Sequence, residues 1–324
     1  MAELLLFALG TTRPLGEGVS RALGAPLAAH EEREFEWGQH KARPLVNVRG
    51  RDVYVLHSLH GEPGQSANDK LCRLLFFLGA LRDASAGRVT AVVPFLCYSR
   101  KDRKTKPRDP VTTRYVAALF EAVGADRVLT VDVHNLAAYQ NAFRCRAEHL
   151  EGRPLLVERL APALREQEAV VVSPDAGGVH RADALRASLA RALGRPVDLA
   201  FVEKRRSEGV VSGDLLAGDV RGRTAVIVDD MISSGTTTLR AARACLREGA
   251  ARVVAAASHA AFTPGADEAL ADPALARVLV LDTVPPRGVE RAREKLEVAP
   301  VAPLLGEAVR RLHEGGSLVD LLEG

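Results

Sequence analysis

Residues 226–238 read Val226-Ile227-Val228-Asp229-Asp230-Met231-Ile232-Ser233-Ser234-Gly235-Thr236-Thr237-Thr238. The pattern is typical of a buried strand that ends in two acids and is followed by a hydroxyl-rich turn and a helix. At the carboxyl end of a parallel strand, the backbone N–H groups of such a turn and the N-terminus of the next helix favour an anion. Serine and threonine hydroxyls add donors, so the stretch predicts a phosphate site.

The two carboxylates, Asp229 and Asp230, narrow the class of ligand. They would repel a phosphate, so we expect them to accept hydrogen bonds from sugar hydroxyls or to help hold a cation. A phosphate beside a diol indicates a sugar phosphate. The alternative is an Asp-rich turn whose serines and threonines only cap the helix.

The same alternation of strand and helix runs outward from this stretch through the whole chain. Apolar, β-rich segments alternate with longer Ala/Leu/Arg segments that carry helical periodicity. Strands are predicted at 52–56, 89–94, 128–131, 170–172, 199–202, 225–228, 253–255 and 278–281. The fold class is therefore α/β, with mostly parallel sheets flanked by helices.

A long-range repeat predicts two similar domains. Residues 112–134 resemble residues 237–259 at a constant spacing of 125 positions, although chance matching of common residues is the alternative. We expect an N-terminal domain at 1–150 and a C-terminal domain at 151–324, whose last segment, about 295–324, packs partly on the N-terminal domain. At this spacing the two acids fall on Lys104 and Thr105, so the first half carries a degenerate loop and the second half the sugar-phosphate site.

A second candidate loop, 173–178, follows the strand at 170–172 and reads Ser173-Pro174-Asp175-Ala176-Gly177-Gly178. Paired glycines let backbone amides approach and cradle an anion, as a diphosphate would require. Asp175 suits a magnesium ion that accompanies the diphosphate. An unliganded turn is the competing explanation.

The segment 100–108 has six basic residues in nine positions and follows another strand. The phosphates of a nucleotide and a nucleic acid are both candidate partners, and a solvated basic loop is the alternative. No aromatic residues interleave to stack on bases, which favours the nucleotide. No Walker A loop occurs, so ATP would bind without one. His134 ends a further strand and suits a metal or phosphate contact, or a purely structural role.

Composition excludes several classes of protein. The 324 residues carry a net charge of +3, which does not indicate general binding to nucleic acid. No stretch is long and apolar enough to predict a membrane helix, and the opening apolar run lacks a basic region before it. The four cysteines are far apart and predict neither disulfides nor a zinc site, so we expect a cytoplasmic protein with free thiols.

Taken together, these motifs resemble the ribose-phosphate pyrophosphokinase (PRPP synthetase) family, whose fold is two phosphoribosyltransferase-like (type I) domains. The resemblance extends over nearly the whole chain, from Phe35 through 100–103, 124–128, 173–175 and 229–231 to a terminal segment that includes 313–315. It implies an enzyme that transfers the β,γ-diphosphoryl group of MgATP to O1 of ribose 5-phosphate, giving PRPP and AMP. It also implies Mg²⁺ as cofactor and a homo-oligomer, as dimers or a hexamer.

The resemblance assigns a role to each matching residue. It gives Lys204 and Arg206 the stabilisation of charge on the transferred group, and it adds Arg206 to the ribose 5-phosphate site. His134 and Asp175 match magnesium-associated positions. The remaining matches are ribose binding at Asp229 and Asp230, the 5-phosphate loop at Ser233, Ser234, Gly235, Thr236 and Thr237, the diphosphate loop at Asp175, Ala176, Gly177 and Gly178, and ATP contacts at Phe35, Trp37, Gly38, Gln39, Arg100, Lys101, Asp102 and His134.

Some residues depart from the family pattern. The segment 35–39, which corresponds to the part that reaches the adenine of a neighbouring subunit, reads Phe-Glu-Trp-Gly-Gln where Phe-Ser-Asp-Gly-Glu is usual. Lys101 replaces a glutamine, and Thr236 stands where glycine is usual, adding a side chain where backbone normally approaches the ligand. The alternatives to a synthetase are a non-catalytic regulatory subunit and a phosphoribosyltransferase that consumes PRPP. Retention of Lys204 and Arg206 favours the catalytic protein.

Overall fold

Two mostly parallel sheets organise the chain, one in each of two compact units. The structure, a computed structural model, describes residues 2–207 and 210–323, with the side chains of all of these except 204–207, 210–214 and 323. Unit 1 comprises the chain up to Glu151 together with the segment from Val301 onward, and unit 2 comprises Gly152–Pro300. Each unit is described by itself below.

The sheet of unit 1 has five parallel strands in the order β1-β4-β5-β6-β7. All residues of β4 and β6 are buried, which explains why these strands are continuous apolar runs without alternation. Their bounds are β1 (Leu4–Ala8), β4 (Asp52–Leu56), β5 (Arg88–Val93), β6 (Arg127–Val131) and β7 (Arg146–Leu150).

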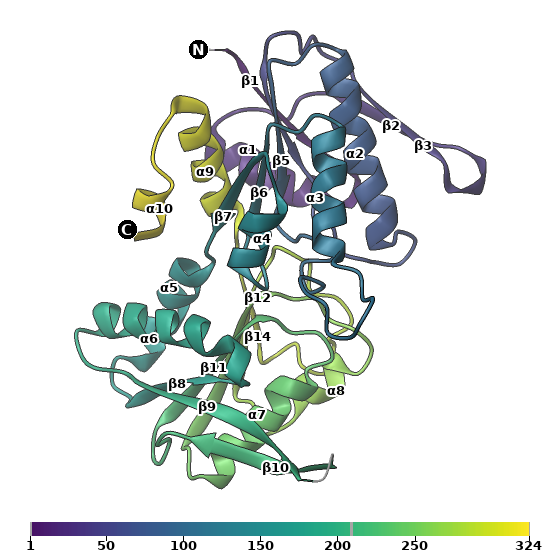
Figure 1. The fold of residues 1–324 in the computed structure, drawn as a ribbon. Helices are drawn as coiled ribbons and strands as arrows, with labels where there is room; N and C mark the ends of the chain where they lie inside the picture. The colour runs from purple at the N-terminus through teal and green to yellow at the C-terminus, as the bar shows by residue number, and fades with distance from the viewer. Residues whose placement is uncertain (1, 208–209, 324) are drawn as a thin grey trace. The chain divides into compact units, whose positions relative to one another are not determined.

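Helices cover both faces of this sheet. Helices α2 and α3 lie side by side (Figure 1) and share one apolar core with β4, β5 and β6, while α1 packs against α9. A capping box of Ser66 and Asp69 fixes the start of α2. The helices are α1 (Arg13–Leu23), α2 (Ala67–Asp83), α3 (Thr112–Ala122), α4 (Leu136–Ala142), α9 (Ala302–Glu314) and α10 (Val319–Glu323), with a 3-10 turn η1 (Gly10–Thr12) after β1.

A two-stranded antiparallel ribbon of β2 (His30–Glu34) and β3 (His40–Pro44) projects from the five-stranded sheet of this unit (Figure 1). A 3-10 turn, η2 (Glu36–Gly38), forms its tip. The sequence analysis did not anticipate this ribbon, because its polar residues give no apolar periodicity.

The sheet of unit 2 has the strand order β10-β9-β8-β11-β12-β13-β14, with only β10 antiparallel to its neighbour. The chain adds β9 on one side of β8 and β11 on the other, so the order reverses between β8 and β11. In open α/β sheets, ligands bind at the carboxyl ends of the strands at such a reversal. The bounds are β8 (Ala169–Ser173), β9 (Asp198–Ser207), β10 (Val210–Ala217), β11 (Thr224–Met231), β12 (Arg252–His259), β13 (Arg277–Leu281) and β14 (Leu296–Ala299).

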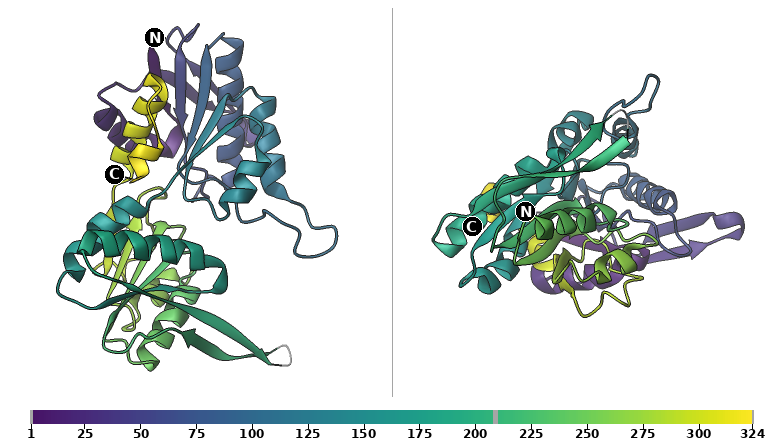
Figure 2. Two further views of the ribbon diagram at one scale, coloured as in Figure 1. Left: turned by 60° about the vertical axis from the view of Figure 1, so that its left-hand side comes forward. Right: turned by 90° about the horizontal axis from the view of Figure 1, so that it is seen from below.

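Two apolar clusters place the helices of unit 2 on opposite faces of its sheet. One cluster joins α5 and α6 to the sheet, and the other joins α7 and α8 to it. Strands β9 and β10 extend beyond the sheet as a ribbon (Figure 2). The helices are α5 (Arg153–Leu164), α6 (Val179–Leu193), α7 (Thr236–Arg247) and α8 (Ala266–Ala271), with a 3-10 turn η3 (Ala176–Gly178) before α6.

Strand pairing corrects part of the predicted repeat. The spacing of 125 residues relates β6 to β12, but Thr90 pairs with Arg127 while Thr224 pairs with Arg252. Asp229 and Asp230 therefore correspond to Phe95 and Leu96, not to Lys104 and Thr105. The loop between β5 and α3 is longer than the loop between β11 and α7, and a constant spacing cannot register that difference. The first unit still lacks the acidic pair.

No helix in the described part of the chain is both long and apolar enough to cross a membrane. All four cysteines are free thiols, two of them buried.

Candidate functional site

The acidic pair lies at the end of β11, where the strand order of unit 2 reverses. Asp229 is half-buried and Asp230 is buried. Burial and the neighbouring Asp230 carboxyl raise the pKa of Asp229 to about 7, although the Arg181 guanidinium opposes this shift. With a pKa of about 7, the Asp229 carboxyl is only partly ionised at neutral pH.

Arg181 is a site residue that sequence reasoning missed. It lies in the first turn of α6, and its guanidinium is 3.5 Å from Asp229 Oδ1 and 3.8 Å from Asp230 Oδ1. A Cβ on Gly178 would lie 3.9 Å from the same guanidinium. Arg181 thus connects the acidic pair to the glycine loop after β8. Its place three residues after two glycines is the one signal that could have found it.

The hydroxyl-rich loop lies directly after the acids and leads into α7. Gly235 caps the helix in a left-handed conformation (φ +74°) and is buried, whereas Ser233, Ser234 and Thr237 are half-buried and Thr236 is exposed. Ser234 Oγ lies 3.0 Å from Thr236 Oγ1, so these hydroxyls face one another across the turn. The loop and the helix N-terminus together offer donors to an anion, as predicted.

The loop after β8 folds on its own carboxylate. Asp175 Oδ1 accepts hydrogen bonds from the amides of Gly177 (3.0 Å) and Gly178 (3.1 Å), and Ser173 Oγ donates to the Asp175 carbonyl. The amides that we expected to cradle a diphosphate thus already bind an anionic oxygen within the chain. Ala176 and Gly177 are exposed, so the turn is open to a ligand from outside.

In unit 1 the basic loop is ordered around Asp109. Its Oδ2 accepts from Lys101 Nζ (2.8 Å), from Thr105 and from the amide of Lys106, and these partners hold the pKa of Asp109 well below its usual range. Lys101 is therefore engaged inside the loop, a role that the sequence did not indicate. Arg100 is exposed.

A hydrogen bond connects this loop to the end of β6. Asn135 Nδ2 donates to Asp102 Oδ2 at 2.8 Å, and Asn135 directly follows the exposed His134. Asp102 is thus tied to the segment that carries His134, another predicted ATP-binding residue.

The other predicted ATP contacts lie at the tip of the β2–β3 ribbon. Trp37 is 96% exposed and has a positive φ of 58°, and Phe35 is 40% exposed. The Arg33 guanidinium stacks over the Phe35 ring at 5.1 Å. Gly38 and Gln39 are also exposed, so the tip presents a free aromatic surface.

Lys204 and Arg206, the predicted catalytic residues, lie on β9, but their side chains fall outside the described residues. No three His, Cys, Asp or Glu side chains of the described residues gather into a metal site. Proteins usually hold Mg²⁺ through one or two carboxylates together with substrate phosphates. Asp175 is a carboxylate of the required kind beside anion-binding amides.

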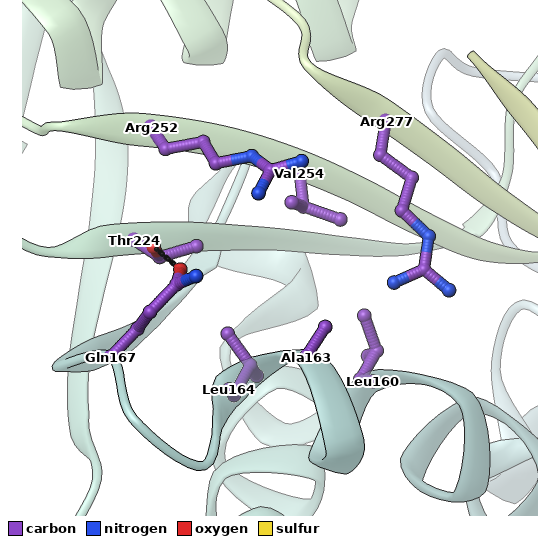
Figure 3. Close-up of a pocket in the computed structure, with 8 residues that line it drawn as sticks. All are labelled: Leu160, Ala163, Leu164, Gln167, Thr224, Arg252, Val254 and Arg277. Carbon is purple, nitrogen blue, oxygen red and sulfur yellow. Dashed lines mark hydrogen bonds between the residues drawn. The ribbon is translucent and has the colours of Figure 1, made fainter. Parts of the chain in front are cut away.

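A small cavity of unit 2 is not the site. It has a volume of about 20 Å³, room for about one water molecule, and it lies at the amino ends of β11, β12 and β13 (Figure 3). Thr224 and Gln167 hydrogen-bond in its wall at 2.8 Å. It is at the wrong edge of the sheet for a ligand of an open α/β fold.

Comparison with known proteins identifies the family. Residues 4–124 match the N-terminal domain of ribose phosphate pyrophosphokinase, and residues 211–323 match the phosphoribosyl synthetase-associated domain. A ribose-phosphate pyrophosphokinase of Hyphomonas neptunium is 38% identical over 98% of this chain and 99% of its own. The chain belongs to the ribose-phosphate pyrophosphokinase family.

Two further relatives support the same family assignment. A ribose-phosphate pyrophosphokinase of Prochlorococcus marinus is 39% identical over 100% of this chain and 95% of its own. The crystal structure of phosphoribosylpyrophosphate synthetase from Mycobacterium smegmatis superposes with a TM-score of 0.88 at 35% identity, covering 97% of this chain and all of that chain. The predicted family and the predicted α/β fold of two phosphoribosyltransferase-like domains are confirmed.

Proposed function

We propose that this chain is a ribose-phosphate diphosphokinase, which transfers the β,γ-diphosphoryl group of ATP to O1 of ribose 5-phosphate and releases AMP. The observation that carries the proposal is the acidic pair beside a hydroxyl-rich helix N-terminus at the strand reversal of unit 2. That arrangement offers acceptors to the sugar hydroxyls and donors to the 5-phosphate in one place. A chain of this family with this site has the parts that the reaction needs.

The residues of unit 2 would position the acceptor sugar. Asp229 and Asp230 accept hydrogen bonds from the ribose hydroxyls, and residues 233–237 hold the 5-phosphate. Arg181 lies between the two carboxylates and the diphosphate loop and partly neutralises the carboxylates. Held in this way, O1 attacks the β-phosphorus in line, a new O–P bond forms, and the bond from the β-phosphorus to the AMP oxygen breaks.

We assign to Lys204, Arg206 and Arg100 the neutralisation of negative charge on the transferred group. We also assign to Arg206 a contact with the sugar phosphate. Mg²⁺, when bound, would neutralise phosphate charge, and we propose Asp175 and His134 as the residues that would hold it. The amides of Gly177 and Gly178 already bind one carboxylate oxygen, which supports their proposed role as anion donors beside Ala176.

Nucleotide binding is assigned to Arg100, Lys101, Asp102 and His134, together with the ribbon tip at 35–39. The exposed Trp37 and Phe35 suit stacking on a base. Because a ribbon tip that projects from its own unit reaches outward, we propose a homo-oligomer in which the tip serves a neighbouring subunit. Light scattering that finds a fully active monomer would contradict this. The free cysteines support a reducing location such as the cytoplasm.

The experiment is a product assay with the purified chain, ribose 5-phosphate and Mg²⁺, supplied in turn with ATP, GTP and CTP. We expect AMP and PRPP from ATP in equal amounts. If only GTP or CTP were turned over, the change to Trp37 and Gln39 would have altered the base specificity of the enzyme. Folded, assembled protein that turns over none of them would instead be a regulatory subunit.

The sharpest variant is Lys204→Ala. If Lys204 stabilises charge on the transferred group, kcat falls by about 10²–10³-fold while the melting temperature stays constant. The matched control is Arg221→Ala, a cation whose side chain is 79% exposed and paired only with Asp219 among the described residues; its kcat should stay unchanged. Equal kcat for both variants would remove Lys204 from the mechanism.

A further inference from the structure

The carboxyl edge of the unit 1 sheet carries a second cluster of polar side chains, outside the proposed active site. Tyr54 pairs with Thr90 as Ala169 pairs with Thr224, so the loop after β4 corresponds to the diphosphate loop after β8. Counted along this register, His60 stands where unit 2 has Asp175. The loop from His57 to Gln65 lies beside η1, which follows the neighbouring strand β1.

Gly10, in η1, faces three polar side chains from three different segments. A Cβ built on Gly10 would lie 3.7 Å from Glu32 Oε2, 3.8 Å from His57 Cε1 and 4.0 Å from Gln65 Oε1. Gly10 has a positive φ of 48°, so glycine is favoured here on conformational grounds as well. The ends of β1 and β4 and the start of the β2–β3 ribbon thus converge on one small space.

Two buried atoms around this space have no hydrogen-bond partner among the described residues: His57 Nε2 and Gln65 Oε1. His57 is 0% exposed, and its ring is fixed because Nδ1 lies 3.0 Å from Thr12 Oγ1, which accepts the Ser58 amide. Reciprocal backbone hydrogen bonds between Glu62 and Gln65 fix the loop. A buried polar atom without a partner is costly, so this pair of atoms points to a ligand.

The third group, Glu32, supplies the charge. Its Oε1 accepts from the Gly10 amide at 2.7 Å and lies 3.0 Å from His30 Nε2, which leaves Oε2 toward the space. The Glu32 side chain is 24% exposed, so a small ion can reach the space from this side. Burial, the largest single effect, acts to raise the pKa of Glu32. The hydrogen bonds with His30 and the Gly10 amide act against it, and the net result is a lowered pKa.

The neighbouring charges do not exclude a cation. Lys70 is fully buried, but it pairs directly with Glu62 at 2.5 Å, and Arg73 pairs with Glu34 at 2.6 Å. In the tautomer whose Nδ1–H donates to Thr12 Oγ1, His57 Nε2 carries the lone pair that can bind a metal. His60 Nε2 lies 3.2 Å from Lys70 Nζ, beside the pair of Lys70 and Glu62.

We propose that His57 Nε2, Glu32 Oε2 and Gln65 Oε1 hold a divalent first-row transition-metal ion. One imidazole nitrogen with two oxygens suits Mn²⁺, Co²⁺ or Zn²⁺ better than Mg²⁺, which prefers oxygen alone. The ion would tie β1, the β2–β3 ribbon and the loop before α2 together, and thereby support the ribbon whose tip carries Trp37. The site is separate from His134 and Asp175 and does not depend on the proposed catalytic activity.

The test is titration of the full chain, first stripped with a chelator, with Co²⁺ alone, followed by visible absorption and by equilibrium dialysis. We expect one tightly bound Co²⁺ per chain, displaced by Zn²⁺, and a higher melting temperature when the ion is bound. His57→Gln should weaken binding at least tenfold. The matched control is His180→Gln, which removes an exposed histidine of unit 2 and should leave the binding constant unchanged.

Two milder variants keep the proposal testable if His57→Gln does not fold. Gln65→Leu removes one donor at nearly constant volume, and Gly10→Ala puts a methyl group into the space at ordinary contact distances. Both should weaken Co²⁺ binding, whereas His134→Ala should not. Folded wild-type protein that binds no Co²⁺ or Zn²⁺, or that binds them equally well in every variant, overturns the proposal and indicates a buried water molecule instead.

Discussion

The carboxyl edges of the two sheets correspond in strand register, yet they carry opposite kinds of chemistry. In unit 2 the edge has short loops of glycine, serine and threonine, an acidic pair with one raised pKa, and the facing hydroxyls of Ser234 and Thr236. In unit 1 the same edge has a fully buried lysine paired with a glutamate, and a long basic loop folded around Asp109. The unit 2 edge leaves its hydroxyls half-buried or exposed, whereas at the unit 1 edge Lys70 and Asp109 are paired within the chain.

Because the two edges correspond in strand register, the chemical difference between them lies in the composition of their loops. Where Asp229 and Asp230 stand in unit 2, unit 1 has Phe95 and the buried Leu96, so neither of these two positions of unit 1 carries a carboxylate. Polar side chains at a sheet edge are then either kept for a ligand or satisfied by neighbours, because burying them without partners costs free energy. Variants can separate these two uses.

The largest effect on stability is expected for Lys70→Met. The side chains of Lys70 and Glu62 are 0% and 3% exposed, so removal of the cation leaves a buried carboxylate without its charge partner. The free energy of unfolding, measured with urea, should fall by about 3–5 kcal/mol. The control Lys41→Met removes a pair of Lys41 and Glu31 at the surface and should cost less than about 1 kcal/mol. If both variants lost the same free energy of unfolding, the buried pair of Lys70 and Glu62 would contribute no more to stability than the surface pair.

After Lys204→Ala, substitution of the acidic pair should give the largest effect on substrate use. Asp229→Asn removes a charged acceptor from the sugar hydroxyls, so kcat/KM for ribose 5-phosphate should fall tenfold to a hundredfold, as expected for about 1.5–3 kcal/mol. The control Asp219→Asn, in an exposed pair with Arg221, should leave kcat/KM within twofold. A similar loss in both would remove Asp229 from the site.

The pH dependence of the same group follows from its pKa, raised to about 7 from an unfolded value near 3.8. Because the folded state favours the protonated carboxyl, its stabilising contribution is complete below about pH 4 and is lost as the pH rises through about 7. Activity runs the other way, since the ionised acceptor binds the hydroxyls, so kcat/KM should fall as the pH drops below 7. In Asp229→Asn both dependences should flatten. A kcat/KM profile with an unchanged acidic limb in that variant would contradict the assignment.

A smaller effect is expected where the phosphate loop turns. Gly235 has φ +74°, and a Cβ there would lie 2.9 Å from Ala269 Cβ, so Gly235→Ala adds a contact to conformational strain. The control Gly222→Ala has a similar φ of +70° with nothing within 4 Å of its Cβ, and it therefore measures the strain alone, about 1–2 kcal/mol. The melting temperature of Gly235→Ala should fall further than that of the control. An equal fall would mean that α8 moves aside at no cost.

The α/β architecture and the unit 2 site could be predicted from the sequence because local patterns encode them. An apolar strand that ends in Asp229-Asp230 and a hydroxyl-rich helix start is a continuous signal, and the neighbouring strand reversal brings the loop with Asp175 to the same edge. Residues close together in the chain therefore make up most of the proposed site.

What the sequence could not predict depends on contacts between distant segments. Arg181 is one arginine among many until α6 places it 3.5 Å from Asp229. Lys70, in the first turn of a helix, looks like a surface lysine, and its burial depends on Glu62 in the preceding loop. The constant spacing wrongly matched the acidic pair to Lys104 and Thr105. The loop after β5 is longer than the loop after β11, and only the strand pairing shows this difference.

The smallest expected effect tests the hydroxyl of Thr236, which stands at the same repeat position as Val111 in unit 1, where α3 begins without a side-chain cap. Thr236→Val gives the unit 2 loop the side chain of unit 1: the volume stays nearly constant, and the donor 3.0 Å from Ser234 Oγ is lost. If that hydroxyl donates to the 5-phosphate, the Kd for ribose 5-phosphate, measured by calorimetry, should rise about threefold to tenfold. Thr236→Gly should change the Kd less, because it removes the donor but opens the backbone amides to the phosphate. A wild-type Kd in Thr236→Val would mean that the helix N-terminus alone holds the phosphate, and that the ligand edge differs from the unit 1 edge only through its glycine and its acids.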